Sequence, residues 1–244
     1  ETRSLMYIAD AIGLLKGSKS WKDSDQRAMQ QWYADYLKWL LTSKNGGEEH
    51  RAKNNHGTWY YAQVIDFALF SGNRSKAIQL VEESKKRLDS QITREGKQPL
   101  ELERTNALGY STMNLDGWFT VAKLAKHVKV DLWNYKSGLG VGFRDALDWL
   151  IPFALGRKKF EYQQIHAYDK GGIYPLLLQA GFVYNDEKYV NSSLVELGPA
   201  DKDWLTDLLF SRGSGSTSYN TLRVLTYNIH HANPPSKTSC NYRR

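Results

Sequence analysis

The chain has 244 residues, of which 41% are hydrophobic, so it can form a sizeable core and cannot be disordered throughout. Its formal net charge of +7 comes from scattered lysines and arginines, which permits an anionic partner without singling out nucleic acid. The single cysteine, Cys240, excludes an internal disulfide and a cysteine-based metal cluster.

No apolar run approaches the roughly 18 residues that a membrane-spanning helix requires. Nothing at the start resembles a signal peptide, but the chain opens on Glu1 in what reads as mid-protein sequence, so a leader could have been removed. Aromatic residues make up 13% of the chain, with 8 Trp and 15 Tyr. Such rings are typical of sugar-binding proteins, although a Trp-rich helical core would explain them equally well.

Helical periodicity dominates the first two-thirds of the chain. Apolar residues recur at three- and four-residue spacing from Leu5 to Leu15, and acidic N-cap chemistry at 23–25 opens a second helix that we expect Gly46 and Gly47 to end. The same patterns predict further helices over residues 55–70, 75–88, 104–127, 143–155 and 175–183. We therefore predict an all-α domain of antiparallel helix pairs over residues 1–190.

The composition changes near residue 190. Residues 191–219 are rich in Ser, Gly and Pro and are typical of a loop or linker. Residues 220–244 form a tail in which 222–231 alternate like a strand, and this tail could be the remnant of a second domain.

A first polar and aromatic motif lies at the start of the predicted helix 55–70. On a helix, four of its side chains fall on one face, with an asparagine pair beside them at the helix start. An Asn–His pair of this kind is costly to bury without partners, although an N-cap and a satisfied core histidine would also explain it. The motif contains Asn54, Asn55, His56, Trp59, Tyr60 and Gln63.

A second motif runs from Gln98 to Tyr110. Here Glu103, Asn106 and Tyr110 share one face of the predicted helix. Arg104 and Tyr110 can converge on one ligand only if Arg104 lies at the helix start and its long side chain reaches round. A capping carboxylate, a surface arginine and a core tyrosine are the ordinary alternatives.

Together, residues 54–60, 98–101 and 104–110 resemble the signature of the alginate lyase superfamily, which includes polysaccharide lyase family five and the related glucuronan lyases. The resemblance covers about residues 20–130, and loosely extends to 190. It implies an (α/α) toroid of paired helices with a cleft across one end. It also implies eliminative cleavage of a uronic-acid polymer such as alginate or glucuronan, without a metal or other cofactor.

The resemblance also implies roles for four residues. Asn55 and Arg104 would neutralise the uronate carboxylate, so that the C5 proton becomes acidic. His56 would serve as the base or help to neutralise the carboxylate. Tyr110 would donate a proton to the leaving O4, and could also accept the C5 proton, because Arg104 nearby would stabilise its phenolate.

Sugar stereochemistry gives a weak indication of the substrate. In mannuronate and glucuronate the C5 proton and O4 lie on the same side of the ring, so one tyrosine could act as base and acid. In guluronate they lie on opposite sides, which favours a separate base such as His56. The tyrosine therefore favours mannuronate- or glucuronate-type substrates.

Further side chains are candidates for substrate binding. Glu101 and Glu103 make a poor glycosidase pair, because residues two apart point different ways on a helix. His230 and His231 lack metal-ligating partners at a suitable spacing. The predicted substrate-binding residues are Asn54, Trp59, Tyr60, Gln63, Glu101, Gln163, His166 and Tyr168.

The chain also departs from the family pattern. Lyases of this kind carry a substantial helical region before the Asn–His motif, whereas only 54 residues precede Asn55, so we expect an incomplete toroid or a fragment. Residues 222–231 resemble the opening strand of an endonuclease/exonuclease/phosphatase domain, but too little follows to support such an activity.

Two other functions remain open from the sequence. The chain could be a non-catalytic polyuronate-binding module, or a glycoside hydrolase on the same helical scaffold. We expect an anionic polysaccharide as partner, no nucleic acid and no membrane span. The substrate class predicts a periplasmic or secreted protein, while the oligomeric state stays undetermined.

Overall fold

The computed structural model describes residues 2–194, which fold into helices without any extended strand. The chain divides into two compact units, Glu1–Leu176 and Leu177–Arg244. Two short 3₁₀ helices, η1 (Thr2–Ser4) and η2 (Lys170–Gly172), accompany the α-helices of the first unit. These α-helices are α1 (Leu5–Leu15), α2 (Asp23–Thr42), α3 (Lys44–Arg51), α4 (Asn55–Phe70), α5 (Arg74–Gln91), α6 (Pro99–Leu102), α7 (Ala107–Lys126) and α8 (Phe143–Ala154).

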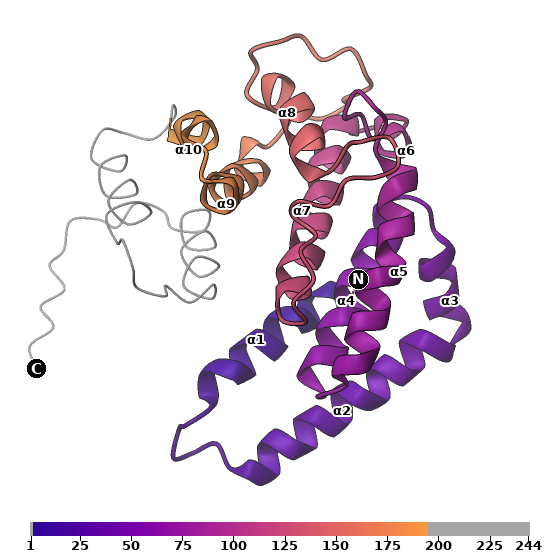
Figure 1. The fold of residues 1–244 in the computed structure, drawn as a ribbon, viewed down its shortest axis with the longest axis vertical. Coiled ribbons are helices and arrows are strands. Elements are labelled where there is room, and N and C mark those ends of the chain that lie inside the picture. The colour runs from indigo at the N-terminus through magenta and orange to yellow at the C-terminus, as the bar shows by residue number, and fades with distance from the viewer. Residues whose placement is uncertain (1, 195–244) are drawn as a thin grey trace, which may run out of the picture. The chain divides into compact units, whose positions relative to one another are not determined.

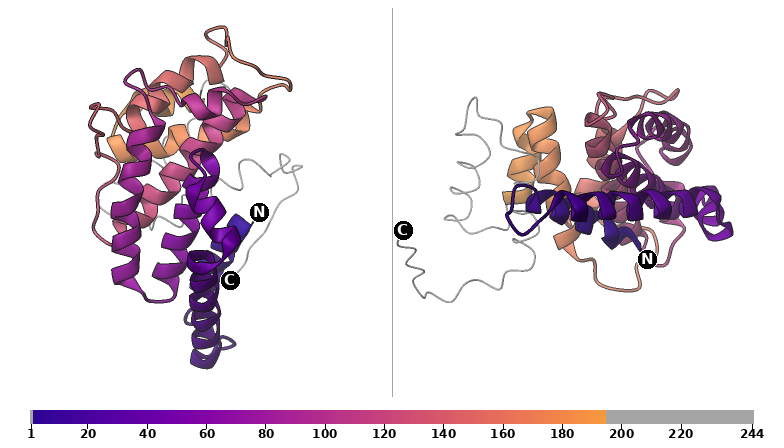
Figure 2. Two further views of the ribbon diagram at one scale, coloured as in Figure 1. Left: turned by 90° about the vertical axis from the view of Figure 1, so that its right-hand side faces the viewer. Right: turned by 90° about the horizontal axis from the view of Figure 1, so that it is seen from below.

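Helix α4 is the centre of the first unit. It packs against α1, α2, α3, α5 and α7, and Figure 1 shows α4, α5 and α7 side by side with α2 alongside them. Twelve of its sixteen residues are buried, which explains why its sequence is apolar nearly all round. Figure 2 shows the neighbouring α2 as a long helix that extends past the others of this unit.

Helices α4 and α5 form an antiparallel pair with a short connection, as the sequence predicts, whereas residues 127–142 join α7 to α8. Helix α4 ends at Phe70 and α5 begins at Arg74, where the Asn73 side chain accepts a hydrogen bond from the Lys76 N–H at 3.2 Å. The far side of α7 packs against α8 through aromatic rings, with the ring centroids of Trp118 and Phe143 5.9 Å apart. The predicted all-α class is therefore confirmed for the described residues.

The prediction that Gly46 and Gly47 end a helix is wrong. Helix α2 ends at Thr42, and Ser43 caps a new helix, α3, by accepting a hydrogen bond from the Gly46 N–H at 3.0 Å. Gly46 lies so close to the backbone carbonyl of Leu40 that a Cβ there would clash with it. The glycine therefore permits a close approach of two helices, and it does not terminate either of them.

The helix predicted over residues 104–127 begins later than expected. Helix α7 starts at Ala107, because Asn106 pairs with Gln164 in an isolated antiparallel bridge and the Ala107 N–H donates to the Gln163 carbonyl. Residues 103–106 therefore form a turn between α6 and α7. Glu103, Asn106 and Tyr110 accordingly do not share one helix face.

The second unit contains α10 (Glu187–Leu194) and most of α9 (Tyr174–Tyr184) among its described residues. The ring centroids of Tyr184 and Tyr189 lie 6.1 Å apart across the turn between the two helices. The domain boundary predicted at residue 190 falls inside α10. The predicted linker beyond 194, the strand-like segment 222–231, Cys240, His230 and His231 lie outside the described residues.

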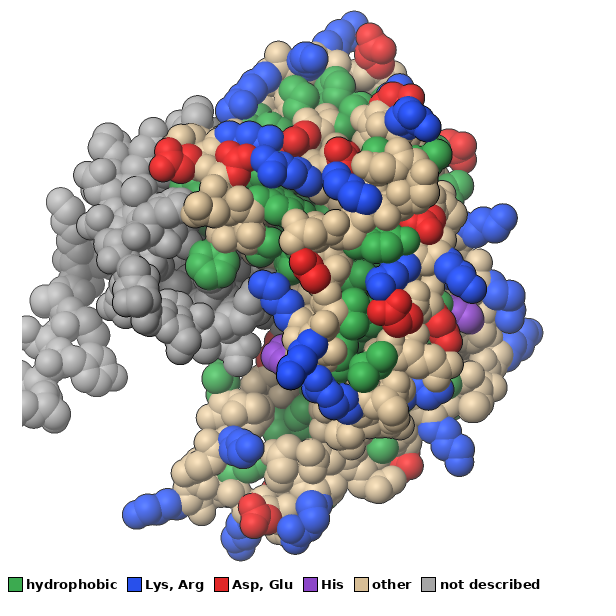
Figure 3. All heavy atoms as spheres, viewed as in Figure 1, with side chains coloured by type: hydrophobic (Ala, Val, Ile, Leu, Met, Phe, Trp, Pro, Cys, Tyr) green, Lys and Arg blue, Asp and Glu red, His purple; other side chains and the backbone are tan. Residues whose placement is uncertain are grey.

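Charged residues are mixed over the surface. Figure 3 shows lysines and arginines spread over one face and interspersed with aspartates and glutamates, in keeping with the scattered charge of the sequence. Along residues 2–194, no helix is long and apolar enough to cross a bilayer.

One buried carboxyl makes a testable contribution to stability. Asp66 on α4 is 6% exposed, and its Oδ2 has no hydrogen-bond partner among the described residues. Burial raises the pKa of Asp66 to about 8. The folded state therefore binds more protons than the unfolded state between the two pKa values, and stability falls as the pH rises through that window.

We predict that Asp66→Asn raises the unfolding midpoint at about pH 8 while changing it little at about pH 4, where the native carboxyl is already protonated. Denaturant unfolding across this pH range measures the difference between the two proteins. A constant difference at every pH would contradict the raised pKa of Asp66.

Candidate active site

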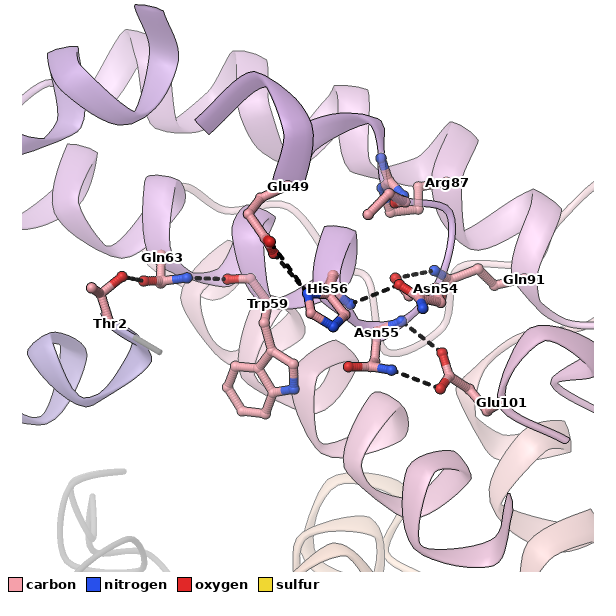
Figure 4. Close-up of polar contacts among 11 residues, drawn as sticks. Thr2, Glu49, Asn54, Asn55, His56, Trp59, Gln63, Arg87, Gln91 and Glu101 are labelled. Atoms are coloured by element: carbon pink, nitrogen blue, oxygen red, sulfur yellow. Dashed lines mark hydrogen bonds and ion pairs between the residues drawn. The ribbon is translucent and has the colours of Figure 1, made fainter. Parts of the chain in front are cut away.

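The asparagine pair forms the start of α4. The Asn54 side chain caps the helix by accepting a hydrogen bond from the His56 N–H at 3.2 Å. Asn55 is only 5% exposed, and two of its N–H groups reach Glu101 on α6 (Figure 4). Its backbone N–H donates to Glu101 Oε1 at 2.6 Å, and its side-chain Nδ2 donates to Oε2 at 2.7 Å.

Glu101 is itself buried, with 1% of its surface exposed. Burial raises the pKa of this carboxyl, and the two hydrogen bonds from Asn55 and the charges of Arg104 and His56 oppose that rise. A carboxylate only accepts hydrogen bonds, so its contact with Nδ2 settles which end of the Asn55 amide is the nitrogen. Within residues 2–194, the side-chain carbonyl oxygen and the second side-chain N–H of Asn55 form no hydrogen bond and are left for other partners.

His56 is oriented by a carboxylate from a neighbouring helix. Its Nδ1 lies 3.0 Å from Oε2 of Glu49 on α3, and the two side chains are 53% and 51% exposed. A carboxylate at Nδ1 favours the tautomer with the proton on Nδ1, which leaves the Nε2 lone pair able to accept a proton. The arrangement suits a general base.

Gly57 makes the close connection between α3 and α4 possible. A Cβ at this position would clash with the Ala52 carbonyl and with the guanidinium of Arg87. Arg87 on α5 donates hydrogen bonds to the carbonyls of Ala52 and His50, and so fixes the end of α3. Residue 57, which directly follows Asn55 and His56 in α4, must therefore be small.

Arg104 and Tyr110 lie together. The Arg104 guanidinium carbon is 3.9 Å from the centroid of the Tyr110 ring, in a cation–π contact. Arg104 lies in the turn before α7 and Tyr110 lies in the first turn of that helix. Arg104 thus reaches the tyrosine from just before the helix, as its convergence with Tyr110 required.

The segment 163–168 crosses the start of α7. The Ile165 N–H donates to the Thr105 carbonyl at 3.0 Å, and the His166 N–H donates to Asn106 Oδ1 at 3.1 Å. The Tyr168 hydroxyl lies 2.8 Å from Thr112 Oγ1, and burial raises the pKa of Tyr168 to about 12. Of the predicted binding residues, Gln163 and His166 are therefore held beside the start of α7 through their backbones, and Tyr168 through its hydroxyl.

Two predicted binding residues are buried and have internal roles instead. Tyr60 is 4% exposed, and its hydroxyl donates to the Leu40 carbonyl at 3.4 Å, so it packs on the α2 side of α4. Glu101 holds Asn55 and is not available to a sugar. The sequence does not show that Tyr60 is internal, because the sides of a helix that is apolar nearly all round look alike. The role of Glu101 depends on a partner 46 residues away.

Two further predicted binding residues lie against the N-terminal turn. Trp59 is 7% exposed, and Arg3 stacks over its ring with the guanidinium carbon 5.0 Å from the centroid. The Gln63 amide donates to the Trp59 carbonyl at 3.1 Å and accepts from the Thr2 hydroxyl at 2.7 Å (Figure 4). Both side chains are thus engaged within the protein.

Several residues around the site were not predicted from the sequence. Glu49 went unnoticed because α3 was not expected, and Arg3 because nothing in the pattern links the N-terminus to α4. Gln164 accepts a hydrogen bond from the Leu108 N–H at 3.1 Å and so caps α7 from a distant segment. No local sequence pattern marks these residues, because each acts through a partner that is distant in the chain.

Glu101 interacts with three of the four predicted catalytic residues. It bonds Asn55, and the charges of Arg104 and His56 act on its carboxyl, while Arg104 stacks on Tyr110. That the four side chains meet at one sugar ring stays a prediction. Among residues 2–194, no group of three or more His, Cys, Asp or Glu side chains could hold a metal ion.

Comparisons with known proteins place the chain in a family. The family model for alginate lyase matches residues 2–160. The crystal structure of an alginate lyase from Bacteroides ovatus is similar, with a TM-score of 0.77 and 34% sequence identity.

The alignment to that structure covers 86% of this chain and 56% of the Bacteroides protein, so the chain spans a little over half of its relative's length. A search of curated proteins finds no match. The match of the family model over more than half of the chain shows that this protein belongs to the alginate lyase family, and it has that family's all-α, toroid-type fold.

Proposed function

We propose that this protein is a polysaccharide lyase that cleaves a polyuronate by β-elimination. The observation that carries the proposal is the fixed amide of Asn55, held by a buried carboxylate next to the stacked Arg104–Tyr110 pair. Family membership and the similarity to an alginate lyase support the same reaction class.

The first task of such an enzyme is to stabilise charge on the uronate carboxyl group. Removal of the C5 proton delocalises negative charge onto that group. The free N–H of Asn55 and the guanidinium of Arg104 are suited to hydrogen-bond it, and Glu101 keeps the amide turned the right way. These donors are worth most in the transition state, where the charge is largest.

The second task is proton transfer. The C5–H electron pair forms the C4–C5 double bond as the C4–O4 bond breaks, and the leaving oxygen takes a proton. In this proposal the Tyr110 hydroxyl provides this proton, and as a phenolate it also accepts the C5 proton on substrates where the C5 proton and O4 lie on one side of the ring. His56, with Nδ1 held by Glu49, offers Nε2 as a separate base.

The substrate class that this chemistry favours is mannuronate- or glucuronate-type. A single tyrosine serves both proton transfers there, whereas guluronate needs the second base. By the same inference from substrate, the protein works in the periplasm or outside the cell. Secretion of a tagged full-length protein by its host is the measurement that tests this location.

A panel of polymers tests the function. The protein is incubated with polymannuronate, polyguluronate and glucuronan, while ultraviolet absorbance of the unsaturated product and new reducing ends are both recorded. Absorbance on at least one polymer supports the lyase. New reducing ends without absorbance would indicate a hydrolase, and binding without cleavage would indicate a non-catalytic module.

Tyr110→Phe should abolish turnover but leave polymer binding nearly intact, because it removes the proton carrier and keeps the ring under Arg104. Loss of a positioned acid or base costs about 10²–10⁴ in rate. Tyr162→Phe, at an exposed position, is the matched control and should behave like the parent. Full activity of Tyr110→Phe would discard the tyrosine mechanism.

His56→Ala should reduce the rate less on polymannuronate than on polyguluronate, because only the second polymer requires a base separate from Tyr110. The ratio of the two rates, measured for parent and variant under one set of conditions, is the test. An equal loss on both polymers would show that His56 is the base throughout or that it mainly holds the carboxylate.

A further inference from the structure

The side chain of Gln91 forms five hydrogen bonds within the first unit. Gln91 is the last residue of α5 and is 3% exposed. Its Oε1 accepts three hydrogen bonds, from Thr58 Oγ1 at 3.1 Å, Asn114 Nδ2 at 3.0 Å and Trp118 Nε1 at 2.7 Å. Its Nε2 donates to the carbonyls of Lys53 at 2.7 Å and Asn54 at 3.2 Å.

These partners permit only one orientation of the Gln91 amide. Nδ2 of Asn114 and Nε1 of Trp118 can only donate hydrogen bonds, and the two backbone carbonyls can only accept them. A flipped Gln91 amide would therefore place its N–H groups against donors and its oxygen against acceptors. A buried polar group with all its partners satisfied is rigid, and leaving its partners unpaired is costly. Gln91 is therefore a fixed bridge between separate segments.

The segments that Gln91 joins carry the two halves of the candidate site. Its Nε2 holds the turn of Lys53 and Asn54, which leads directly into Asn55 and His56 (Figure 4). Its Oε1 holds Asn114, which lies one helical turn after Tyr110 on α7.

We infer that Gln91 is a positioning residue, which keeps the Asn55–His56 turn in register with the Tyr110 helix. The inference rests on the proposed function for its catalytic consequence, but not for its structural one. Among the described residues, Gln91 forms no hydrogen bond with the four predicted catalytic side chains, so it acts through the Asn54 turn.

Gln98 provides a matched comparison. It is a buried glutamine of the same network, 1% exposed, and accepts from Asn114 Nδ2 at 2.8 Å while donating to the Ser111 carbonyl at 3.0 Å. Among the described residues, its side chain forms no hydrogen bond with the Lys53–Asn54 turn. Replacing either glutamine by methionine removes a buried amide of the same size, but only Gln91→Met releases the turn.

Hydrogen exchange tests the structural part. Gln91→Met should speed exchange at the amides of residues 55–58 relative to Gln98→Met, with both proteins folded by circular dichroism. Gln91→Glu is measured in parallel, because it keeps the side-chain volume and one acceptor oxygen but places its second oxygen against the carbonyls of Lys53 and Asn54. It should speed exchange at residues 55–58 as Gln91→Met does. Equal protection of 55–58 in all the variants would overturn the inference.

A double-mutant cycle with Asn55→Ala tests the catalytic part. Gln91→Met should lower kcat/KM by about tenfold or more in the parent, and by much less when Asn55 is already alanine. Gln98→Met should lower it equally in both backgrounds. If the losses from Gln91→Met and Asn55→Ala are additive, Gln91 has a merely structural role. If the parent protein is inactive, the lyase proposal is refuted, and the exchange result alone decides the role of Gln91.

Discussion

The contact between Asn55 and Glu101 is the interaction on which the rest of the site depends. One buried carboxylate accepts both the backbone and the side-chain N–H of the same asparagine, at 2.6 and 2.7 Å. It thereby satisfies an orphan donor at the start of α4 and fixes the amide of the residue that would meet the substrate. Because the carboxylate occupies this helix end, a bound anion must be recognised by side chains.

A network of buried polar side chains connects the helices around the site within an otherwise apolar core. Gln91, Gln98, Asn114 and Glu101 are all less than 4% exposed, and the hydrogen bonds they form join α4, α5, α6 and α7. Each would be costly to bury alone, so the hydrogen bonds among them favour one arrangement of the helices, although Asn114 Oδ1 has no partner among the described residues. The catalytic candidates lie at helix starts and in a turn, where the network holds the backbone.

Much of this structure could be predicted from the sequence, for physical reasons that also explain the failures. The range of α4 follows from an asparagine cap and a glycine stop, and the start of α2 from acidic capping. The split of α2 from α3 does not, because Gly46 serves a close approach that only the fold reveals. The late start of α7 depends on Gln164, 56 residues away from Leu108.

The roles of the site residues likewise divide into those that the sequence predicts and those that it does not. The resemblance of the two motifs to alginate lyases singles out Asn55, His56, Arg104 and Tyr110, each of which alone has an ordinary structural explanation. Burial decides the roles of Tyr60 and Glu101, and burial depends on which face of α4 meets α2 and which meets α6. Gln91 and Glu49 act through partners distant in sequence, so no local pattern identifies them.

The proposed mechanism depends most on whether the buried carboxylate of Glu101 holds the Asn55 amide in the orientation that catalysis needs. The most direct measurement compares the rate of polyuronate cleavage by Glu101→Gln with that of Glu103→Gln, at the exposed neighbouring glutamate. A glutamine at 101 turns a donor toward one of the Asn55 N–H groups, so the account predicts a rate about 10²-fold lower for Glu101→Gln and a near-parental rate for Glu103→Gln. Equal rates for the two folded variants would contradict it.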